Sequence, residues 1–262
     1  MRGVAELLRA ALDGLTRDRE LDASLAQPPA SRPLDELPTP TKDVLSARAW
    51  VSSQPRRPRE RPRIIANIRE NPAGSVGDIT RPAALGTMLE GAMAFALDDA
   101  IDDKCRVIEI RLLRDGAATV THIGPGFAPE RAARGLQRWP WLRRSPAGEV
   151  ILTQSLAAPV VTCALSHWCR LEISRADGIW RQAFYRGEPE SAMRCDPIGP
   201  GRNTYTRVSF RPDPEIFAEL SFSIDDLYMR GLGFLMELSM IELRIHDERT
   251  KVPPLIMVGT GI

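Results

Sequence analysis

The sequence predicts an α+β fold of two layers, with helices on one face of a mixed, mostly antiparallel sheet. One observation is a long apolar segment with helical spacing at residues 82–101. Another is a series of short segments in which apolar and polar residues alternate. Turns at Asp115-Gly116 and at Asp177-Gly178 each join two of these segments. A helical pattern at 223–238 and a strand-like one at 241–247 complete this arrangement.

Four regions are expected along the 262 residues. Residues 1–25 contain an amphipathic helix, because apolar residues from Val4 to Leu15 follow helical spacing. Residues 26–63 are rich in proline and end in the basic run RRPRERPR, which is typical of a linker or a surface arm. Residues 64–252 are expected to form the folded domain, and residues 253–262 a C-terminal tail.

Each element of the folded domain follows from a local pattern. Pro82 stands at the start of the first long helix, where proline is favoured. Residues 138–149 form a polar loop with two tryptophans. Further helices are predicted at 152–166 and 223–238, and strands at 107–112, 118–123, 169–175, 180–185, 204–211 and 241–247.

Composition excludes several classes of protein. Lysine and arginine total 35 against 34 acidic residues, so neither direct DNA binding nor a membrane partner is expected. The four cysteines form no C-x-x-C pair and there are three histidines, so no metal site is expected. The N-terminus is unlike a secretory signal, and no window reaches the roughly 18 apolar residues of a membrane span. We therefore expect a cytoplasmic protein with reduced cysteines.

The stretch TVTHIGPGF at 119–127 is the local pattern that most clearly indicates a ligand-binding turn. A strand-like segment runs into a turn with Gly124 and Gly126, and such glycines let a backbone approach a ligand closely. His122 precedes the turn and can move a proton near neutral pH. Asp98 and Asp99 on the predicted helix are candidate carboxylate partners for it. The alternative for His122 is a surface or hydrogen-bonded histidine at a strand end, and the alternative for the two aspartates is an acidic, solvated helix end.

Three longer strings resemble the ATP-binding domain of the DNA gyrase B subunit, a member of the GHKL class of ATPases. They are IRENPAGSVGD at 68–78, RADGIWRQAFYRGEP at 175–189 and TYTRVSFRPDPEIF at 204–217. Their order and spacing match the family over about residues 64–250, and no gap is needed between Gly77 and Gly126. The resemblance implies the two-layer fold of that domain.

The residues at the family's functional positions differ from its motifs. In the motif E-x-x-D-N the glutamate activates water and the asparagine holds magnesium. A gapless alignment places Gly91 and Phe95 there. A shifted alignment places Asp99 at the asparagine and Phe95 at the glutamate, so the general base is missing in both. Glu90 is adjacent, but one residue turns a helical side chain by about 100°.

Two further motifs are also changed. In D-x-G-x-G the aspartate accepts a hydrogen bond from adenine, and Ile123 is assigned to its position. The phosphate-binding motif G-x-x-G-x-G is replaced by QSLAAP at 154–159, which has no glycine. Thr206 matches a retained pocket residue, and Arg175 and Arg181 match family arginines.

These losses predict no ATP hydrolysis, weak or absent ATP binding, and no cofactor. Because the replacements are small or apolar, the pocket is expected to suit an apolar ligand. The alternative is that the same side chains fill the pocket. The expected catalytic residues are His122, Asp98 and Asp99. The expected ligand-binding residues are Gly91, Ala94, Phe95, Ile123, Gly124, Gly126, Ser155, Leu156, Arg175 and Thr206.

Three functions are consistent with this pattern. The first is a pocket reused for an apolar small molecule, with a cofactor-free cyclisation or isomerisation in specialised metabolism. The second is a pseudo-ATPase that acts through protein contacts, as a gyrase modulator or as a homodimer formed through the N-terminal arm. The third is a genuine ATP-binding domain related to topoisomerases, which requires an alignment different from both of those described.

Overall fold

A computed structural model describes residues 63–138, 143–144, 150–151, 158–197, 203–217, 221–237 and 241–259. The expected N-terminal helix and all but the last residue of the proline-rich region lie outside these ranges. So do most of the tryptophan-containing loop and the expected ligand residues Ser155 and Leu156.

The described residues form one nine-stranded sheet and a separate two-stranded ribbon of β3 (Arg143–Arg144) and β4 (Val150–Ile151). Along the large sheet the order is β11-β10-β1-β2-β9-β5-β6-β7, and β8 also pairs with β6. Among the described strand pairs of this sheet, only β1–β10 is parallel. The strands are β1 (Val107–Leu112), β2 (Ala118–Ile123), β5 (Ser166–Arg175), β6 (Gly178–Tyr185), β7 (Glu188–Pro189), β8 (Arg194–Asp196), β9 (Tyr205–Pro212), β10 (Glu242–Asp247) and β11 (Leu255–Val258).

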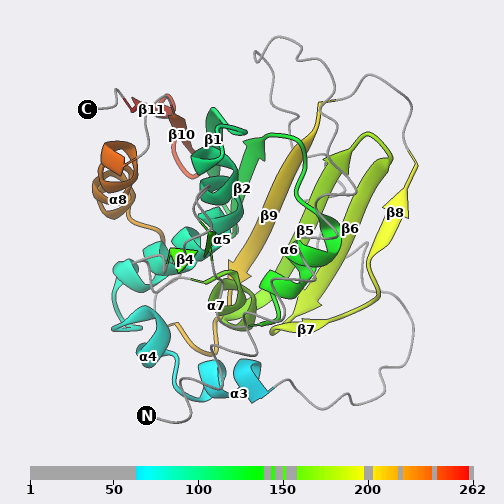
Figure 1. Cartoon of the computed structure of the whole chain (residues 1–262). Helices are drawn as coiled ribbons and strands as arrows, with labels where there is room; N and C mark the ends of the chain where they lie inside the picture. The colour runs from blue at the N-terminus through cyan, green and yellow to red at the C-terminus, as the bar shows by residue number, and fades with distance from the viewer. Residues whose placement is uncertain are drawn as a thin grey trace.

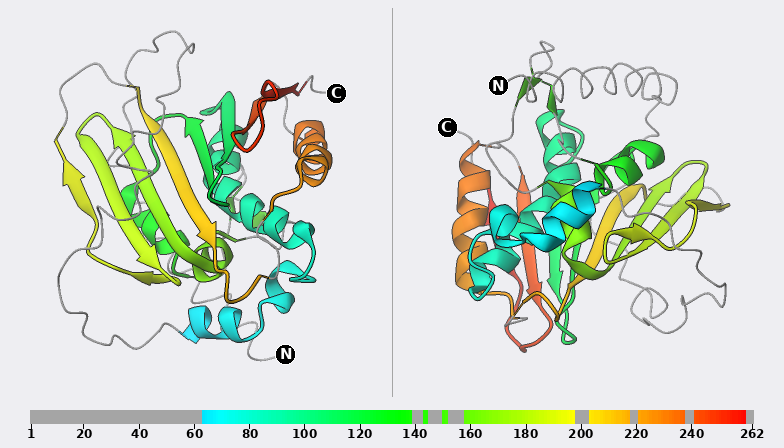
Figure 2. Two further views of the ribbon diagram at one scale, coloured as in Figure 1. Left: turned by 180° about the vertical axis from the view of Figure 1, so that it is seen from behind. Right: turned by 90° about the horizontal axis from the view of Figure 1, so that it is seen from below.

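The helices lie on one face of this sheet. In Figure 1, α5, α6 and α7 lie in front of the strands, and the view from behind in Figure 2 shows β9, β5 and β6 without a described helix across them. The described helices are α3 (Arg63–Glu70), α4 (Ala73–Val76), α5 (Pro82–Ile101), α6 (Pro129–Gly135), α7 (Pro159–Ala164) and α8 (Ile224–Glu237). This is the predicted two-layer fold. None of the helices in the described part of the chain is long and apolar enough to cross a membrane.

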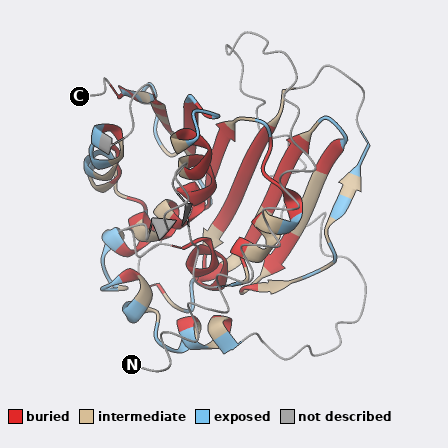
Figure 3. Ribbon diagram, in the orientation of Figure 1, coloured by how far each residue is buried: buried red, intermediate tan, exposed pale blue. Residues whose placement is uncertain are grey.

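Side-chain alternation separates the two faces of the sheet. On the helix side, Ile110, Val120, Val208 and Leu171 are neighbours across successive strands, and all are buried in the core. Figure 3 shows this burial along α5, α7 and the central strands. The helix layer therefore covers an apolar sheet surface, as the strand patterns predict.

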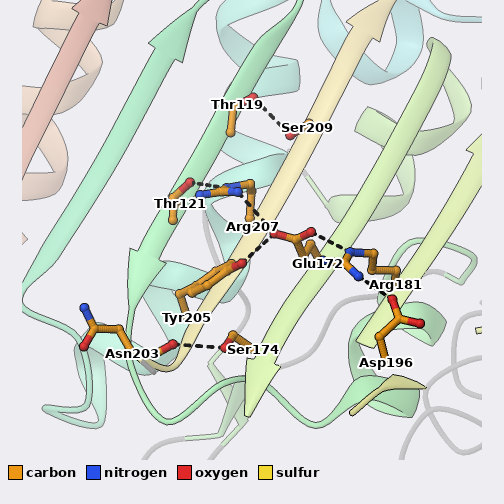
Figure 4. Close-up of polar contacts among 10 residues, drawn as sticks. All are labelled: Thr119, Thr121, Glu172, Ser174, Arg181, Asp196, Asn203, Tyr205, Arg207 and Ser209. Atoms are coloured by element: carbon orange, nitrogen blue, oxygen red, sulfur yellow. Dashed lines mark hydrogen bonds and ion pairs between the residues drawn. The ribbon is translucent and has the colours of Figure 1, made fainter. Parts of the chain in front are cut away.

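The opposite face of the same strands is polar and internally paired (Figure 4). The carboxylate of Glu172 accepts hydrogen bonds from the Tyr205 hydroxyl at 2.6 Å, from Arg207 Nη1 at 3.1 Å and from Arg181 Nε at 2.8 Å. Arg207 Nε also donates to Thr121 Oγ1 at 3.1 Å. These bonds satisfy charged groups that would otherwise be costly to bury.

Most predicted elements are confirmed, and two boundaries differ. The helix expected at 152–166 is described only from Pro159 to Ala164, and Ser166 already begins β5. Proline at the first helical position favours a start there, and β5 needs the following residues to pair with β6 and β9. The expected tail contains β11, because the apolar segment Leu255–Val258 pairs with β10.

Candidate functional site

The glycine turn after β2 is tightly held by β5. Gly126 has a φ of +78°, which L side chains rarely adopt. A Cβ atom on Gly126 would lie 2.6 Å from the carbonyl oxygen of Ser174 and 2.8 Å from Cγ of Arg175. Arg175 Nη1 donates a 2.6 Å hydrogen bond to the Gly126 carbonyl. The turn thus needs glycine for its own packing, whether or not a ligand approaches it.

The residue after the turn joins it to the helix layer. The Phe127 N–H donates to Thr206 Oγ1 at 3.0 Å, so Thr206 holds the turn rather than pointing at a vacant site. The Phe127 ring packs against Phe95 of α5, with ring centroids 5.2 Å apart. The Arg131 guanidinium lies over the Phe127 ring, 4.9 Å from its centroid. Phe127 and Arg131 had no distinguishing sequence pattern.

A histidine–carboxylate pair lies beneath the turn. His122 Nε2 is 2.9 Å from Asp99 Oδ2, and the two side chains are 2% and 8% exposed. A Cβ on Gly124 would meet the same Asp99 oxygen at 3.1 Å. The structure therefore brings together His122 and Asp99 from two segments, as one of the predicted pairings required. Because both are buried, the pair also satisfies two polar groups within the core.

The neighbouring carboxylate has a different environment. Asp98 is buried, and one of its oxygens lies 3.7 Å from the Arg131 guanidinium of α6. Asp98 is therefore not grouped with His122. Of the two candidate partners, only Asp99 is placed for proton exchange with the imidazole.

On the other side of the site, α5 and α7 touch through Gly91. A Cβ on Gly91 would lie 2.4 Å from Thr162 Oγ1 and 2.8 Å from the carbonyl oxygen of Ala158. The Thr162 hydroxyl in turn donates a 2.6 Å hydrogen bond to the Met88 carbonyl. These contacts leave no room for any side chain at position 91 in this arrangement.

The next turn of α5 is also part of the core. Phe95 is 0% exposed and Ala94 is 8% exposed. Glu90 points away from both and forms an ion pair with Arg230 of α8. The part of α5 around Gly91 and Phe95 is therefore packed with small and apolar side chains, and Asp99 lies one turn further along the helix.

Comparisons with known proteins agree with this fold. No protein-family model matches the chain. The B subunit of a type 2 topoisomerase from Aquifex aeolicus is 30% identical over 210 residues, which cover 71% of this chain and 24% of that protein. The DNA gyrase B subunit of Haloferax volcanii is 29% identical over 218 residues, covering 74% of this chain and 32% of the relative. The structure of the gyrase B subunit from Myxococcus xanthus superimposes with a TM-score of 0.62 at 21% identity, covering 75% of this chain and 56% of that one.

The chain is a divergent gyrase B-like domain. It spans about a quarter to a third of the length of the two curated relatives named above. The likeness supports the expected fold and the expected family resemblance. Whether the domain binds ATP has to be argued from the residues at the motif positions.

One motif assignment in this gyrase B-like domain needs correction. In D-x-G-x-G the aspartate stands two residues before the first glycine, which is His122 when that glycine is Gly124. The sheet agrees, because His122 pairs with Ile108 on the helix side whereas Ile123 belongs to the opposite face. The assignment of Ile123 to the aspartate position was therefore wrong by one residue. The group facing the helices is an imidazole already bonded to Asp99.

The other family matches divide between the two faces. Arg175 and Thr206 hold the glycine turn, as described above. Arg181 lies on the outer face, where it bonds to Glu172 and Asp196. In the shifted alignment Asp99 would serve as a magnesium ligand, but its Oδ2 is bonded to His122. Among the described residues, no group of three His, Cys, Asp or Glu side chains could hold a metal ion.

The cysteines near the site are poor nucleophiles. Burial and, to a smaller extent, the nearby charge of Asp99 raise the pKa of the Cys105 thiol to about 12. Burial also raises the pKa of Cys163 in α7 well above its usual value. Neither thiol is present as thiolate near neutral pH, so neither supports covalent catalysis.

Proposed function

We propose that this gyrase B-like domain does not hydrolyse ATP. The carrying observation is the absence of space at Gly91, the position that the resemblance gives to the water-activating glutamate. A Cβ atom there would lie 2.4 Å from the Thr162 hydroxyl oxygen and 2.8 Å from the Ala158 carbonyl oxygen. A base at this position would need α7 to move away.

Two neighbouring positions support the same proposal. The place given to the magnesium ligand holds Phe95, which is buried against Phe127. The place given to the adenine-binding carboxylate holds His122, whose Nε2 is engaged by Asp99. A triphosphate without magnesium would bring uncompensated charge to an apolar surface, at a large free-energy cost. The residues present thus do not fit magnesium-ATP.

The test is phosphate release from magnesium-ATP by the purified chain, with a gyrase B subunit as positive control. We expect no release above the background without protein. The variant Gly91→Glu is expected to lose stability and to gain no hydrolysis, because the site also lacks the metal ligand. Hydrolysis by the unmodified chain would overturn the proposal and would favour the genuine ATP-binding domain.

For its positive role, we favour action through protein contacts over small-molecule catalysis. The described surface of α5 at the ATP-binding position is occupied by packed side chains, which supports a domain that works as a binding module. The N-terminal arm remains a proposed route to a partner or to a homodimer. Addition of the chain to a gyrase supercoiling assay tests the modulator role, and an unchanged rate at excess chain would exclude it.

A ligand pocket for an apolar small molecule is the second candidate. Ala94, Ala158 and the Phe95–Phe127 pair favour it, since they form an apolar surface beside the buried His122–Asp99 pair. In this role the imidazole would shuttle a proton during a cofactor-free cyclisation or isomerisation.

A thermal-shift comparison separates the two candidates. Specific binding raises the midpoint of unfolding by mass action. A shift with an apolar polycyclic or polyene compound, and none with magnesium-ATP, would favour the ligand pocket. The variant His122→Gln then tests whether the bound compound is also transformed. No shift with any compound would leave the contact role as the better account.

A further inference from the structure

The exposed large apolar side chains of the described residues gather at one end of the sheet. All of them belong to α8, to β11 or to the loop before β11. Met236 of α8 is 72% exposed, and Ile256 and Val258 of β11 are 56% and 60% exposed. An exposed apolar patch of this kind marks an interaction surface. The full set is Tyr228, Met229, Leu232, Met236, Val252, Ile256 and Val258.

Contacts of α8 show which way its apolar residues point. Gly231 faces the sheet, because a Cβ there would lie 2.5 Å from Cε of Met257 and 2.9 Å from Cδ2 of Leu243. Arg230 points toward α5, where it pairs with Glu90. Since successive helical residues are turned by about 100°, Leu232 lies on the side of Gly231 opposite to Arg230. Leu232 therefore faces away from α5.

Strand β11 forms the outer edge at this end of the sheet, and its outward side pairs with no other strand among the described residues. Its four residues, Leu255–Val258, are all apolar, and β10 is its only strand neighbour among the described residues. The Gly259 N–H donates to the Ile241 carbonyl at 2.8 Å, which sets the phase of the ladder. Alternation then directs the backbone N–H and C=O groups of Ile256 and Val258 outward. Charges and proline normally block such an edge. Pro253 and Pro254 stand just before β11, whereas Leu255–Val258 contains neither.

We propose that two copies of this chain form a symmetric dimer in which their β11 strands pair antiparallel and their α8 helices meet. A two-fold axis perpendicular to the sheet relates two antiparallel neighbours and keeps the same face of each copy on the same side. The exposed apolar residues of the two α8 helices thus meet on the helix side of the sheet. They are Tyr228, Met229, Leu232 and Met236. Ile256 and Val258 meet their symmetry mates on the opposite side. The same two-fold rotation therefore buries the exposed apolar residues of α8 and of β11 and pairs the two β11 edges.

A second copy fits this surface better than an unrelated protein of arbitrary shape. The partner must present an unpaired apolar strand flanked on the correct side by an apolar helix, and the chain's own edge supplies both. Self-pairing of β11 opposes no like charges, because the strand has none. Stable interfaces bury about 800 Å² per partner. A patch of seven side chains plus a short strand edge lies near the lower limit, so we expect dissociation in the micromolar range.

Sedimentation velocity of the full chain over a concentration series, without nucleotide, tests the dimer. Leu232→Glu places a charge between the helices, and Ile256→Pro removes an outward N–H without touching the ladder to β10. Ala192→Glu is the control, since it adds the same charge at an exposed residue between β7 and β8, at the end of the sheet opposite to β11. Met236→Glu is a second helix variant, because this exposed side chain lies outside the core. Circular dichroism and melting confirm that each variant folds.

We expect a concentration-dependent dimer whose dissociation constant rises at least about tenfold, or 1.4 kcal/mol, in Leu232→Glu, Met236→Glu and Ile256→Pro. Ala192→Glu is expected to behave like the unmodified chain. A monomer at about 100 μM, well above the expected micromolar range, would overturn the proposal. So would a dimer that none of the three variants weakens, because it must then form elsewhere, for example through residues 1–62. This dimer does not depend on the proposed absence of ATP hydrolysis, which the phosphate-release assay tests separately.

Discussion

The two sides of the candidate site have diverged to different degrees. The glycine turn after β2 keeps its shape, with Gly126 at positive φ and Arg175 bonded to its carbonyl. The facing surface of α5 is instead closed by Gly91 and Phe95, which pack against α7 and Phe127. A turn of the shape that the resemblance associates with ligand binding thus lies beside a part of α5 that is packed against α7 and Phe127.

The difference has a physical explanation. The turn is needed by the fold, because β5 passes so close to Gly126 that a side chain would collide with its backbone. The position occupied by Gly91 carries no such requirement for an acid, since a glutamate there would serve only chemistry. Under the proposed loss of ATP hydrolysis, residues required for packing are expected to be retained, whereas those required only for chemistry are free to change.

The largest expected effect is at the turn, with Gly126→Ala. Backbone strain at positive φ and the contact with the Ser174 carbonyl together are expected to cost about 2–5 kcal/mol of unfolding free energy. Gly77→Ala is the control, because Gly77 has the same φ of +78° with nothing within 4 Å of its Cβ position. Urea denaturation should show a clearly smaller loss for Gly77→Ala. Equal losses would mean that the close approach of β5 contributes nothing.

The buried pair beneath the turn is expected to come next. Asp99→Asn removes the carboxylate that holds His122, and hydrogen bonds to charged groups contribute about 1.5–3 kcal/mol. Asp98→Asn is the matched control on the same helix, and it should leave the His122 contact intact. A double-mutant cycle of Asp99→Asn with His122→Ala should give a coupling energy of about 1 kcal/mol or more. Strict additivity would mean that the two side chains do not stabilise each other.

On the closed side, Gly91→Ala is expected to destabilise the protein by about 1–2 kcal/mol. The added methyl overpacks the contact with Thr162 by about 1–3 kcal/mol, partly offset by the higher helix propensity of alanine. The control Gly233→Ala lies in open space on α8 and should instead stabilise by about 0.5–1 kcal/mol. If thermal unfolding moves in the same direction for both variants, the close contact between α5 and α7 is not present.

The smallest expected effect is a difference in how often the two sides of the site open locally. Each side contains a buried cysteine whose rate of reaction with a thiol reagent measures this opening. Cys105 precedes β1 next to exposed residues, whereas Cys163 lies within α7 and is 0% exposed. A thiol reagent at pH 8 should therefore modify Cys105 sooner than Cys163, and Cys163 only on global unfolding. Mass spectrometry of peptides after timed labelling gives both rates. Faster labelling of Cys163 would reverse the assignment of the closed side.

Residue patterns identified the main strands and both long helices because these have a clear period. Short elements such as α4, α6 and β7 were missed, since two to seven residues are too few to show one. The sequence also suggested two carboxylates for His122 but could not choose between them. The choice depends on how α5 rotates against β2, which brings Asp99 to the imidazole and Asp98 to Arg131.

By itself, the sequence determined the two-layer fold and the family resemblance, and it predicted that Gly91 stands at the position of the catalytic glutamate. These depend on local periodicity and on the identity of single residues. Only the tertiary structure decided that Gly91 is closed by α7, that His122 rather than Ile123 faces the helices, and that β11 leaves an apolar edge. Each of these depends on distances between segments far apart in the chain, which packing sets and residue order alone does not specify.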